Sequence, residues 1–133
     1  MATRSESVPI RAPEDLVIVR QRVRAMAEKE RFKLVDQTKI VTAASELARN
    51  AIIHGGGGTA RIEIVEKGGR VGIRIEFEDH GPGIADVELA MKDGYTSGVG
   101  LGLGLSGSKR LSSEFEIHTK PGEGTRVIIT RWR

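Results

Sequence analysis

The 133-residue sequence contains no cysteine, which excludes disulfides and thiolate-bound metal sites and agrees with a reducing compartment. It also has no apolar run approaching the roughly 20 residues that cross a bilayer. Residues 1–15 hold no apolar stretch of signal-peptide length. We therefore expect a cytoplasmic protein that does not span a membrane. The length suits one domain, so we expect residues 1–133 to form a single domain.

Aromatic residues are scarce: three Phe, one Trp and one Tyr. Basic and acidic residues number 21 and 18, which gives a net charge of +3. Nucleic-acid binding needs clustered cations with aromatic side chains between them. Here the cations are scattered along the sequence. The composition therefore argues against a nucleic-acid partner and leaves a mild preference for acidic ones.

Glycine is abundant, and its distribution is uneven. Eight of the 17 glycines lie between Gly81 and Gly107. Glycine marks tight turns or a close approach of the backbone to another group. We therefore expect the ligand in this segment.

The hydrophobic pattern changes period along the chain and predicts both helices and strands. It predicts a short strand over 8–11, a helix that starts at Pro13, and a helix over 36–54 with Asp36 as its N-cap. Strands follow over 60–65, 71–77, 114–118 and 125–131, with a short helix over 105–111 and a mostly irregular segment over 81–104. The expected fold is a two-layer α+β sandwich: a mixed, mostly antiparallel sheet with helices on one face.

Glu46 and Asn50 are four residues apart, so they project from one face of the second helix, beside its apolar stripe. A carboxylate and an amide oxygen at this position can hold a hard cation and orient a hydroxyl group. The alternative is an ordinary solvated polar face.

Asp79 has the same parity as the apolar residues of the strand over 71–77, so its carboxylate should point to the buried face. A buried carboxylate needs hydrogen-bond donors, and the exocyclic amine of adenine is a suitable one. Gly81 and Gly83 would let the backbone approach a ring. The alternative is a turn at the end of a strand, with Asp79 accepting backbone N–H groups.

The segment from Gly98 to Gly104 alternates glycine with Val and Leu and leads into the predicted short helix. Its backbone N–H groups can form a phosphate cradle. A flexible surface loop is the alternative. No P-loop and no eukaryotic-type kinase motif is present.

Together and in this order, these segments resemble the GHKL ATPase/kinase superfamily. The helix with Glu46 and Asn50 resembles its N box, and Asp79-x-Gly81-x-Gly83 its G1 box. Gly98–Gly104 resembles the G2 box and ATP lid, and residues 122–125 resemble the final motif.

The resemblance implies a Bergerat-type fold that binds ATP and Mg²⁺. It implies that Asn50 coordinates Mg²⁺ and that Asp79 hydrogen-bonds the adenine amine, assisted by Gly83 and Thr125. The lid glycines Gly98, Gly100, Gly102 and Gly104 would wrap the phosphates. Glu46 would orient or deprotonate the attacking serine hydroxyl.

Residues 45–50, 98–110 and 124–125, together with the ending Arg131-Trp132-Arg133, are similar to the switch-protein serine kinases of bacterial stress-signalling partner switches. This resemblance implies a kinase that phosphorylates a STAS-domain antagonist, a stressosome component, and activates a PP2C-type phosphatase by direct binding. Two alternatives stay open. One is an anti-sigma factor that binds a sigma factor under nucleotide control. The other is a degenerate fold that binds no ATP.

Overall fold

A computed structural model of the protein describes residues 4–92 and 104–133. Within these ranges the elements are β1 (Arg4–Ile10), α1 (Glu14–Lys29), α2 (Leu34–Ile53), β2 (Gly58–Lys67), β3 (Arg70–Asp79), α3 (Val87–Ala90), α4 (Gly104–Arg110), β4 (Glu114–Lys120) and β5 (Gly124–Trp132). The strands form one five-stranded sheet in the order β1-β2-β3-β5-β4. All of its pairings are antiparallel.

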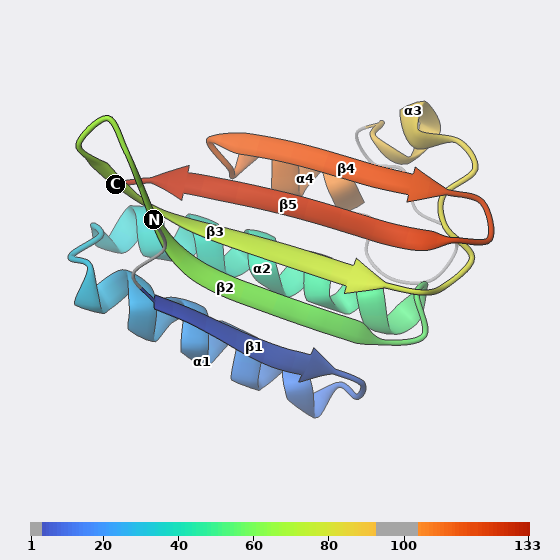
Figure 1. Cartoon of the computed structure of the whole chain (residues 1–133), viewed down its shortest axis with the longest axis horizontal. Helices are drawn as coiled ribbons and strands as arrows, with labels where there is room; N and C mark the ends of the chain where they lie inside the picture. Colours follow the sequence, from blue (N-terminus) through green and yellow to red (C-terminus); the bar gives the residue numbers. More distant parts are fainter. Residues whose placement is uncertain (1–3, 93–103) are drawn as a thin grey trace.

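The helices α1, α2 and α4 lie on one face of this sheet, behind it in Figure 1. The structure therefore confirms the two-layer α+β sandwich and the mostly antiparallel sheet. No helix in the described ranges combines the length and the apolar character that crossing a membrane requires.

The core lies between the sheet and the helices, and it uses both predicted periodicities. Alternate strand residues are buried on the helix-facing side, among them Ile62, Ile64, Ile73, Ile75 and Ile129. They meet apolar stripes from α1 and α2, which include Val19, Val23, Met26, Ile40, Ala44, Leu47 and Ala51. Burying each large aliphatic side chain contributes about 1.5–3 kcal/mol. This burial holds α2 in a fixed orientation on the sheet.

Helix α1 begins after Pro13, as predicted, and Asp15 secures its start. The Asp15 carboxylate accepts hydrogen bonds from the backbone N–H groups of Arg11 (2.8 Å) and Ala12 (3.1 Å). These hydrogen bonds, first that from Arg11, hold the pKa of Asp15 below its ordinary value. The acidic side chain thus fixes the chain where it leaves β1.

The prediction that Asp36 caps α2 is wrong. The helix starts at Leu34, and its N-cap is Lys33, which makes no side-chain capping hydrogen bond. Asp36 instead lies inside the first turn, where its Oδ1 is 2.6 Å from Nη2 of Arg131 on β5. The carboxylate is therefore used in a contact between the two layers. The short helix α3 lies in the segment that was expected to be mostly irregular.

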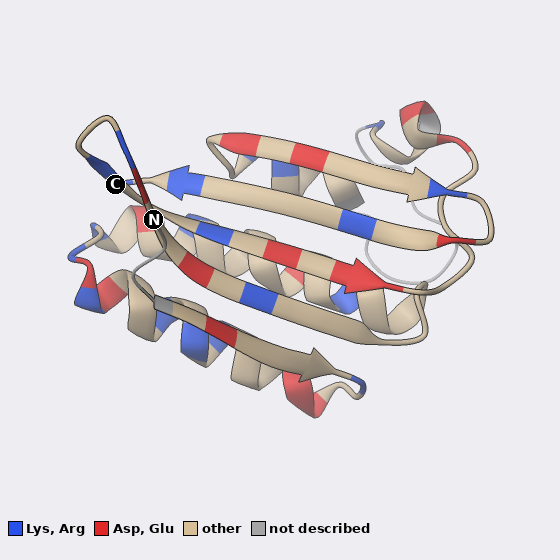
Figure 2. Ribbon diagram, viewed as in Figure 1, with Lys and Arg blue, Asp and Glu red and all other residues tan. Residues whose placement is uncertain are grey.

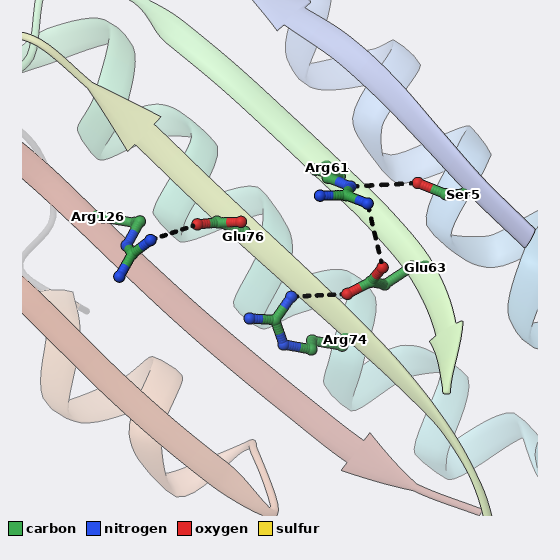
Figure 3. Close-up of polar contacts among 6 residues, drawn as sticks. All are labelled: Ser5, Arg61, Glu63, Arg74, Glu76 and Arg126. Carbon is green, nitrogen blue, oxygen red and sulfur yellow. Dashed lines mark hydrogen bonds and ion pairs between the residues drawn. The ribbon is translucent and has the colours of Figure 1, made fainter. Parts of the chain in front are cut away.

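The face of the sheet turned away from the helices carries mixed charges along β2, β3, β5 and β4 (Figure 2). Figure 3 shows how they pair: Glu63 lies 2.6 Å from Arg74 and 3.7 Å from Arg61, and Glu76 lies 3.3 Å from Arg126. The Glu63–Arg74 and Glu76–Arg126 pairs join neighbouring strands, whereas Arg61 and Glu63 lie on the same strand. The outer face is thus covered by its own ion pairs.

Trp132 closes this outer face at one end of β5. A Cβ on Gly72 would lie 2.7 Å from the indole ring, so glycine at this position lets the ring pack on the backbone of β3. The indole Nε1 donates to Glu114 on β4 at 2.7 Å, and the guanidinium of Arg70 lies 5.8 Å from the ring centroid. Trp132 therefore contacts the two strands that flank its own.

Arg131→Ala should destabilise the fold. Arg131 donates to Asp36 and to the carbonyl oxygen of Leu111, and its side chain is 17% exposed. Its loss leaves both acceptors without a donor, so we expect a decrease of about 2–4 kcal/mol in the free energy of unfolding. Urea denaturation followed by circular dichroism measures this change.

Arg126→Ala is the matched control, because it breaks the more exposed pair with Glu76. It should cost less than about 1 kcal/mol. Equal decreases in the free energy of unfolding would show that the contacts of Arg131 stabilise the fold no more than the exposed Arg126–Glu76 pair does.

Candidate functional site

The C-terminal end of α2 lies directly against the C-terminal end of β3. A Cβ built on Gly55 would lie 2.3 Å from Cγ of Asp79, and one on Gly81 would lie 2.6 Å from Cα of Gly55. Real atoms do not approach so closely, so both contacts require glycine. The glycines thus let the helix end, the strand end and the following turn meet at one point.

Asp79 occupies the position that its parity predicted. It lies at the end of β3, half-buried, and follows the helix-facing residues Ile75 and Phe77. Its Oδ1 accepts the backbone N–H of Gly81 at 2.9 Å. Its Oδ2 accepts no hydrogen bond from the part of the chain that the structure describes. One oxygen therefore closes the turn, and the other is available to a ligand donor.

The turn after Asp79 is fastened to the hairpin between β4 and β5. Gly83 has φ 75°, and a Cβ there would lie 2.1 Å from the carbonyl oxygen of Lys120. The N–H of Gly122 donates to the carbonyl oxygen of Pro82 at 2.7 Å. Gly83 is thus needed both for its backbone conformation and for space, and the turn has little freedom to move.

Thr125 lies beside Asp79, because the two residues pair directly across β3 and β5. Its hydroxyl is 3.0 Å from that of Thr119, which donates to the carbonyl oxygen of Gly124. A hydroxyl has one proton, so Thr125 is the donor in the pair. Thr119 also accepts the N–H of Ile84 at 2.9 Å.

The sequence reasoning missed two residues that build this site. Gly55 directly follows the predicted helix over 36–54 and was not assigned to the site, although its contact with Asp79 positions the helix end. Thr119 was not singled out, yet it connects the turn to the final hairpin. Thr119 lies opposite Thr125 in the observed β4–β5 pair, one residue beyond the predicted strand over 114–118, so the predicted bounds gave no signal for it.

Asn50 and Glu46 lie on the same helix end as Gly55. Both are half-buried beside the buried residues Leu47 and Ala51, at the edge of the core as predicted. Neither side chain makes a hydrogen bond or ion pair with another described residue. Asn50 lies in the last turn of α2, and its backbone carbonyl oxygen accepts the backbone N–H of His54 at 2.9 Å. The structure thus brings Asn50 to the same end as Asp79, with Glu46 one turn behind.

The side chains at this end fit a magnesium ion that arrives with a nucleotide. Mg²⁺ is held in many proteins by one or two oxygen ligands together with phosphate oxygens and water. The Asn50 amide oxygen can be one such ligand. Within residues 4–92 and 104–133, no group of three His, Cys, Asp or Glu residues could hold a metal alone.

A hollow of about 580 Å³ adjoins the site. Asp79 and Thr125 line it, together with other residues of β3, β4, β5 and the turns next to them: Glu78, His80, Ile117, His118, Thr119, Lys120, Glu123, Gly124 and Arg126. Glu46 and Asn50 are not among the lining residues. The hollow therefore reaches the site only at its strand end, and the Gly55–Asp79 contact defines the site better.

Three of the predicted lid glycines, Gly98, Gly100 and Gly102, lie outside the described residues. Gly104 is the first residue of α4. The predicted phosphate cradle remains a prediction.

The sequence and the fold were compared with known proteins. Residues 35–132 match the family described as histidine kinase-, DNA gyrase B-, and HSP90-like ATPase. The chain is 45% identical over 118 residues to serine/threonine-protein kinase RsbT of Bacillus subtilis, with 89% of each chain covered. It is 38% identical over 103 residues to anti-sigma F factor of Clostridium novyi (strain NT), covering 71% of this chain and 69% of that one.

Solved structures share the fold, and one of them serves as an example. It contains the RsbU and RsbW domains of Rv1364c from Mycobacterium tuberculosis, and it matches 98% of this chain and 33% of that chain. The TM-score is 0.68 at 22% sequence identity.

Gly55→Ala should weaken ATP binding. The new methyl group would collide with the Asp79 carboxylate, so the helix end or the carboxylate must shift. Overpacking of this kind costs about 1–3 kcal/mol, which corresponds to a roughly 5- to 150-fold loss of affinity if the whole cost falls on binding. Titration with a fluorescent ATP analogue measures the dissociation constant.

Gly56→Asn is the matched control. Gly56 has φ 73°, which Asn tolerates, and nothing lies within 4 Å of a Cβ there. Its affinity should stay within about twofold of wild type. A Gly55→Ala protein that binds ATP normally would contradict the role of this contact.

Proposed function

This chain belongs to the family of histidine kinase-, DNA gyrase B- and HSP90-like ATPases, and its similarity to RsbT makes it a protein serine/threonine kinase, so we propose that it phosphorylates a STAS-domain antagonist in a bacterial partner-switching module. The observation that carries the proposal is the meeting of Asp79, Gly55 and the Asn50 turn of α2 at one end of the molecule. This arrangement places a hydrogen-bond acceptor for adenine, the Asp79 carboxylate, at the same end of the molecule as an oxygen ligand for a phosphate-bound cation, the Asn50 amide.

In this proposal the base of ATP binds at Asp79. Oδ2, which accepts no hydrogen bond from the described residues, would accept the exocyclic amine, and the hydroxyl pair of Thr119 and Thr125 lies alongside. The tight turn at Gly81 and Gly83 keeps the carboxylate in place. These groups make the adenine subsite rigid before the ligand arrives, which lowers the entropic cost of binding.

The phosphates would extend from Asp79 toward α2. Asn50 would hold Mg²⁺ through its amide oxygen, and Gly98, Gly100, Gly102 and Gly104 would supply backbone N–H groups. When bound there, Mg²⁺ would neutralise charge on the phosphate oxygens. Glu46, one turn from Asn50, accepts the proton of the substrate serine. The serine oxygen forms the new bond to the γ-phosphorus, and the bond between that phosphorus and the ADP oxygen breaks.

The proposed partners follow from the similarity of the chain to RsbT. The substrate is a STAS-domain antagonist of the stressosome type, and the kinase also activates a PP2C-type phosphatase by direct binding. We place these events in the cytoplasm, where ATP and transcription regulators meet.

An anti-sigma role is the second candidate, because the Clostridium novyi relative is an anti-sigma F factor. In that case a sigma factor would be the partner, and nucleotide would control binding. A stable complex with a sigma factor that dissociates on nucleotide exchange would favour this role over the kinase role.

Glu46→Ala should slow phosphate transfer while nucleotide binding persists. Loss of a general base lowers the rate by roughly 10²–10⁴-fold. Glu46 is half-buried and has no ion pair or hydrogen bond to another described residue, so its removal should not disturb the fold. The test is transfer of label from γ-labelled ATP to a purified STAS-domain partner, beside the wild type.

Label on a partner serine with wild type only would support both the kinase role and the role of Glu46. Undiminished transfer by the variant would remove Glu46 from the mechanism. Absence of transfer by wild type, with tight Mg-dependent ATP binding, would favour the anti-sigma role.

Asn50→Ala should reduce the dependence of ATP affinity on Mg²⁺. The variant lacks the amide oxygen but keeps the adenine subsite at Asp79. Isothermal titration with and without Mg²⁺ measures the difference in affinity. An undiminished gain of affinity from Mg²⁺ in the variant would exclude Asn50 as a ligand.

A further inference from the structure

Three side chains form one row across the sheet at the strand end of the site. Asp79 on β3 pairs directly with Thr125 on β5, and Thr125 pairs with Thr119 on β4. All three residues are half-buried and line the hollow. Directly opposed residues of antiparallel strands share one face of the sheet, with their Cβ atoms about 4.5–5.5 Å apart. A group bound at Asp79 therefore lies next to Thr125, with Thr119 one strand farther away.

The hydroxyl of Thr119 uses all of its hydrogen-bonding capacity within the protein. It donates its one proton to the backbone carbonyl oxygen of Gly124 at 3.0 Å. It accepts the backbone N–H of Ile84 at 2.9 Å, and its second lone pair meets the hydroxyl of Thr125 at 3.0 Å. Two backbone groups thus fix the orientation of this hydroxyl, and toward Thr125 it can only accept.

This arrangement determines the direction in which the Thr125 hydroxyl points. Its one proton is donated to Thr119, so its remaining lone pair can only accept a hydrogen bond. Within residues 4–92 and 104–133, the Thr125 side chain makes no other hydrogen bond. The neighbouring Oδ2 of Asp79 is an acceptor as well. A ligand therefore meets two adjacent acceptors here and no donor from these two side chains.

The basic strand residues beside this row do not supply a donor on the same face. His118 and Lys120 flank Thr119 on β4, and Arg126 follows Thr125 on β5. Successive residues of a strand point to opposite faces of the sheet, so these three side chains belong to the outer face. Among the strand side chains, the site face of the row offers acceptors without donors.

Purine bases differ in what they present to a pair of acceptors. Adenine carries an amino group at C6, whose two N–H bonds are donors, whereas guanine carries an acceptor oxygen there. Hypoxanthine has the same C6 oxygen as guanine. One amino group can donate to both Asp79 and Thr125. A C6 oxygen in its place would leave three acceptors facing one another without a proton, which disfavours binding.

We propose that Thr119 is a positioning residue that makes the site selective for 6-aminopurines. It takes the proton of Thr125 and so leaves only acceptors for the base. This inference rests on the proposed function, in which the base of ATP binds at Asp79. It adds that the choice between purines depends on a residue that acts through its neighbour.

The test compares the affinity of the full-length chain for ATP and for ITP, which carries hypoxanthine in place of adenine. Both are measured with Mg²⁺ by displacement of a fluorescent ATP analogue. Thr119→Val removes the hydroxyl but keeps a similar shape, and Thr119→Ser keeps the hydroxyl. Thr59→Val is the matched control, because it makes the same change at an exposed strand residue that does not line the hollow.

Wild type should bind ATP at least about tenfold more tightly than ITP. In Thr119→Val the Thr125 proton is released and can be donated to the C6 oxygen of ITP. The preference for ATP should therefore fall by about 3- to 10-fold, the usual effect of one hydrogen bond. Thr119→Ser and Thr59→Val should keep the preference within twofold of wild type.

A second background separates this role from a purely structural one. Thr119 also fastens the turn through Ile84, so loss of its hydroxyl should loosen the site for both nucleotides alike. Thr125→Val alone should lower the preference for ATP, because it removes one of the two acceptors. Adding Thr119→Val to Thr125→Val should then leave the ratio of the two affinities unchanged, since the hydroxyl through which Thr119 acts is absent.

Equal affinity of wild type for ATP and ITP would overturn the inference, and phosphate transfer from ATP would still support the proposed function. A preference that Thr119→Val leaves unchanged, or alters equally with and without the Thr125 hydroxyl, would also overturn it. A wild-type chain that binds no ATP would remove the adenine subsite of the proposed function and this inference together.

Discussion

The contact between Gly55 and the Asp79 carboxylate determines the arrangement of the whole site end of the molecule. No side chain fits between them, so the last turn of α2 is set directly against the last residue of β3. Gly124, the first residue of β5, also has to be glycine, because a Cβ there would lie 2.2 Å from the carbonyl oxygen of Asp79. Because these glycines have no side chains, the strand end that carries the Asp79 carboxylate and the helix end that carries the Asn50 amide pack at the same end of the molecule.

The opposite end of the two layers is held by charge. There Arg131 of β5 joins the first turn of α2 through Asp36 and the end of α4 through Leu111. The core between these two fastenings is continuous and apolar. Helix α2 is therefore fixed at both ends by different physical means, and a group placed anywhere along it has a defined position relative to the sheet.

Local patterns predicted what depends on local geometry. The face of Asp79 followed from the period of two along β3, and the burial of Ile40, Ala44 and Leu47 followed from helical spacing. The role of Asp36 could not be predicted, because its partner lies 95 residues away in the sequence. Likewise, the glycine run after α2 predicts where the helix ends, but only packing shows that Gly55 is the residue that meets a carboxylate. The four-residue helix α3 is too short to leave a periodic signal.

The packing of Trp132 gives the protein a built-in optical reporter. It is the only tryptophan in the sequence, and its ring lies on Gly72 with its N–H bonded to Glu114. Its emission should therefore respond when β3, β5 and β4 separate. The indole sits on the outer face, near the end of the sheet where β3 begins, whereas Asp79 is where β3 ends. Intrinsic fluorescence is thus suited to following unfolding, and an added probe is the better choice for following nucleotide.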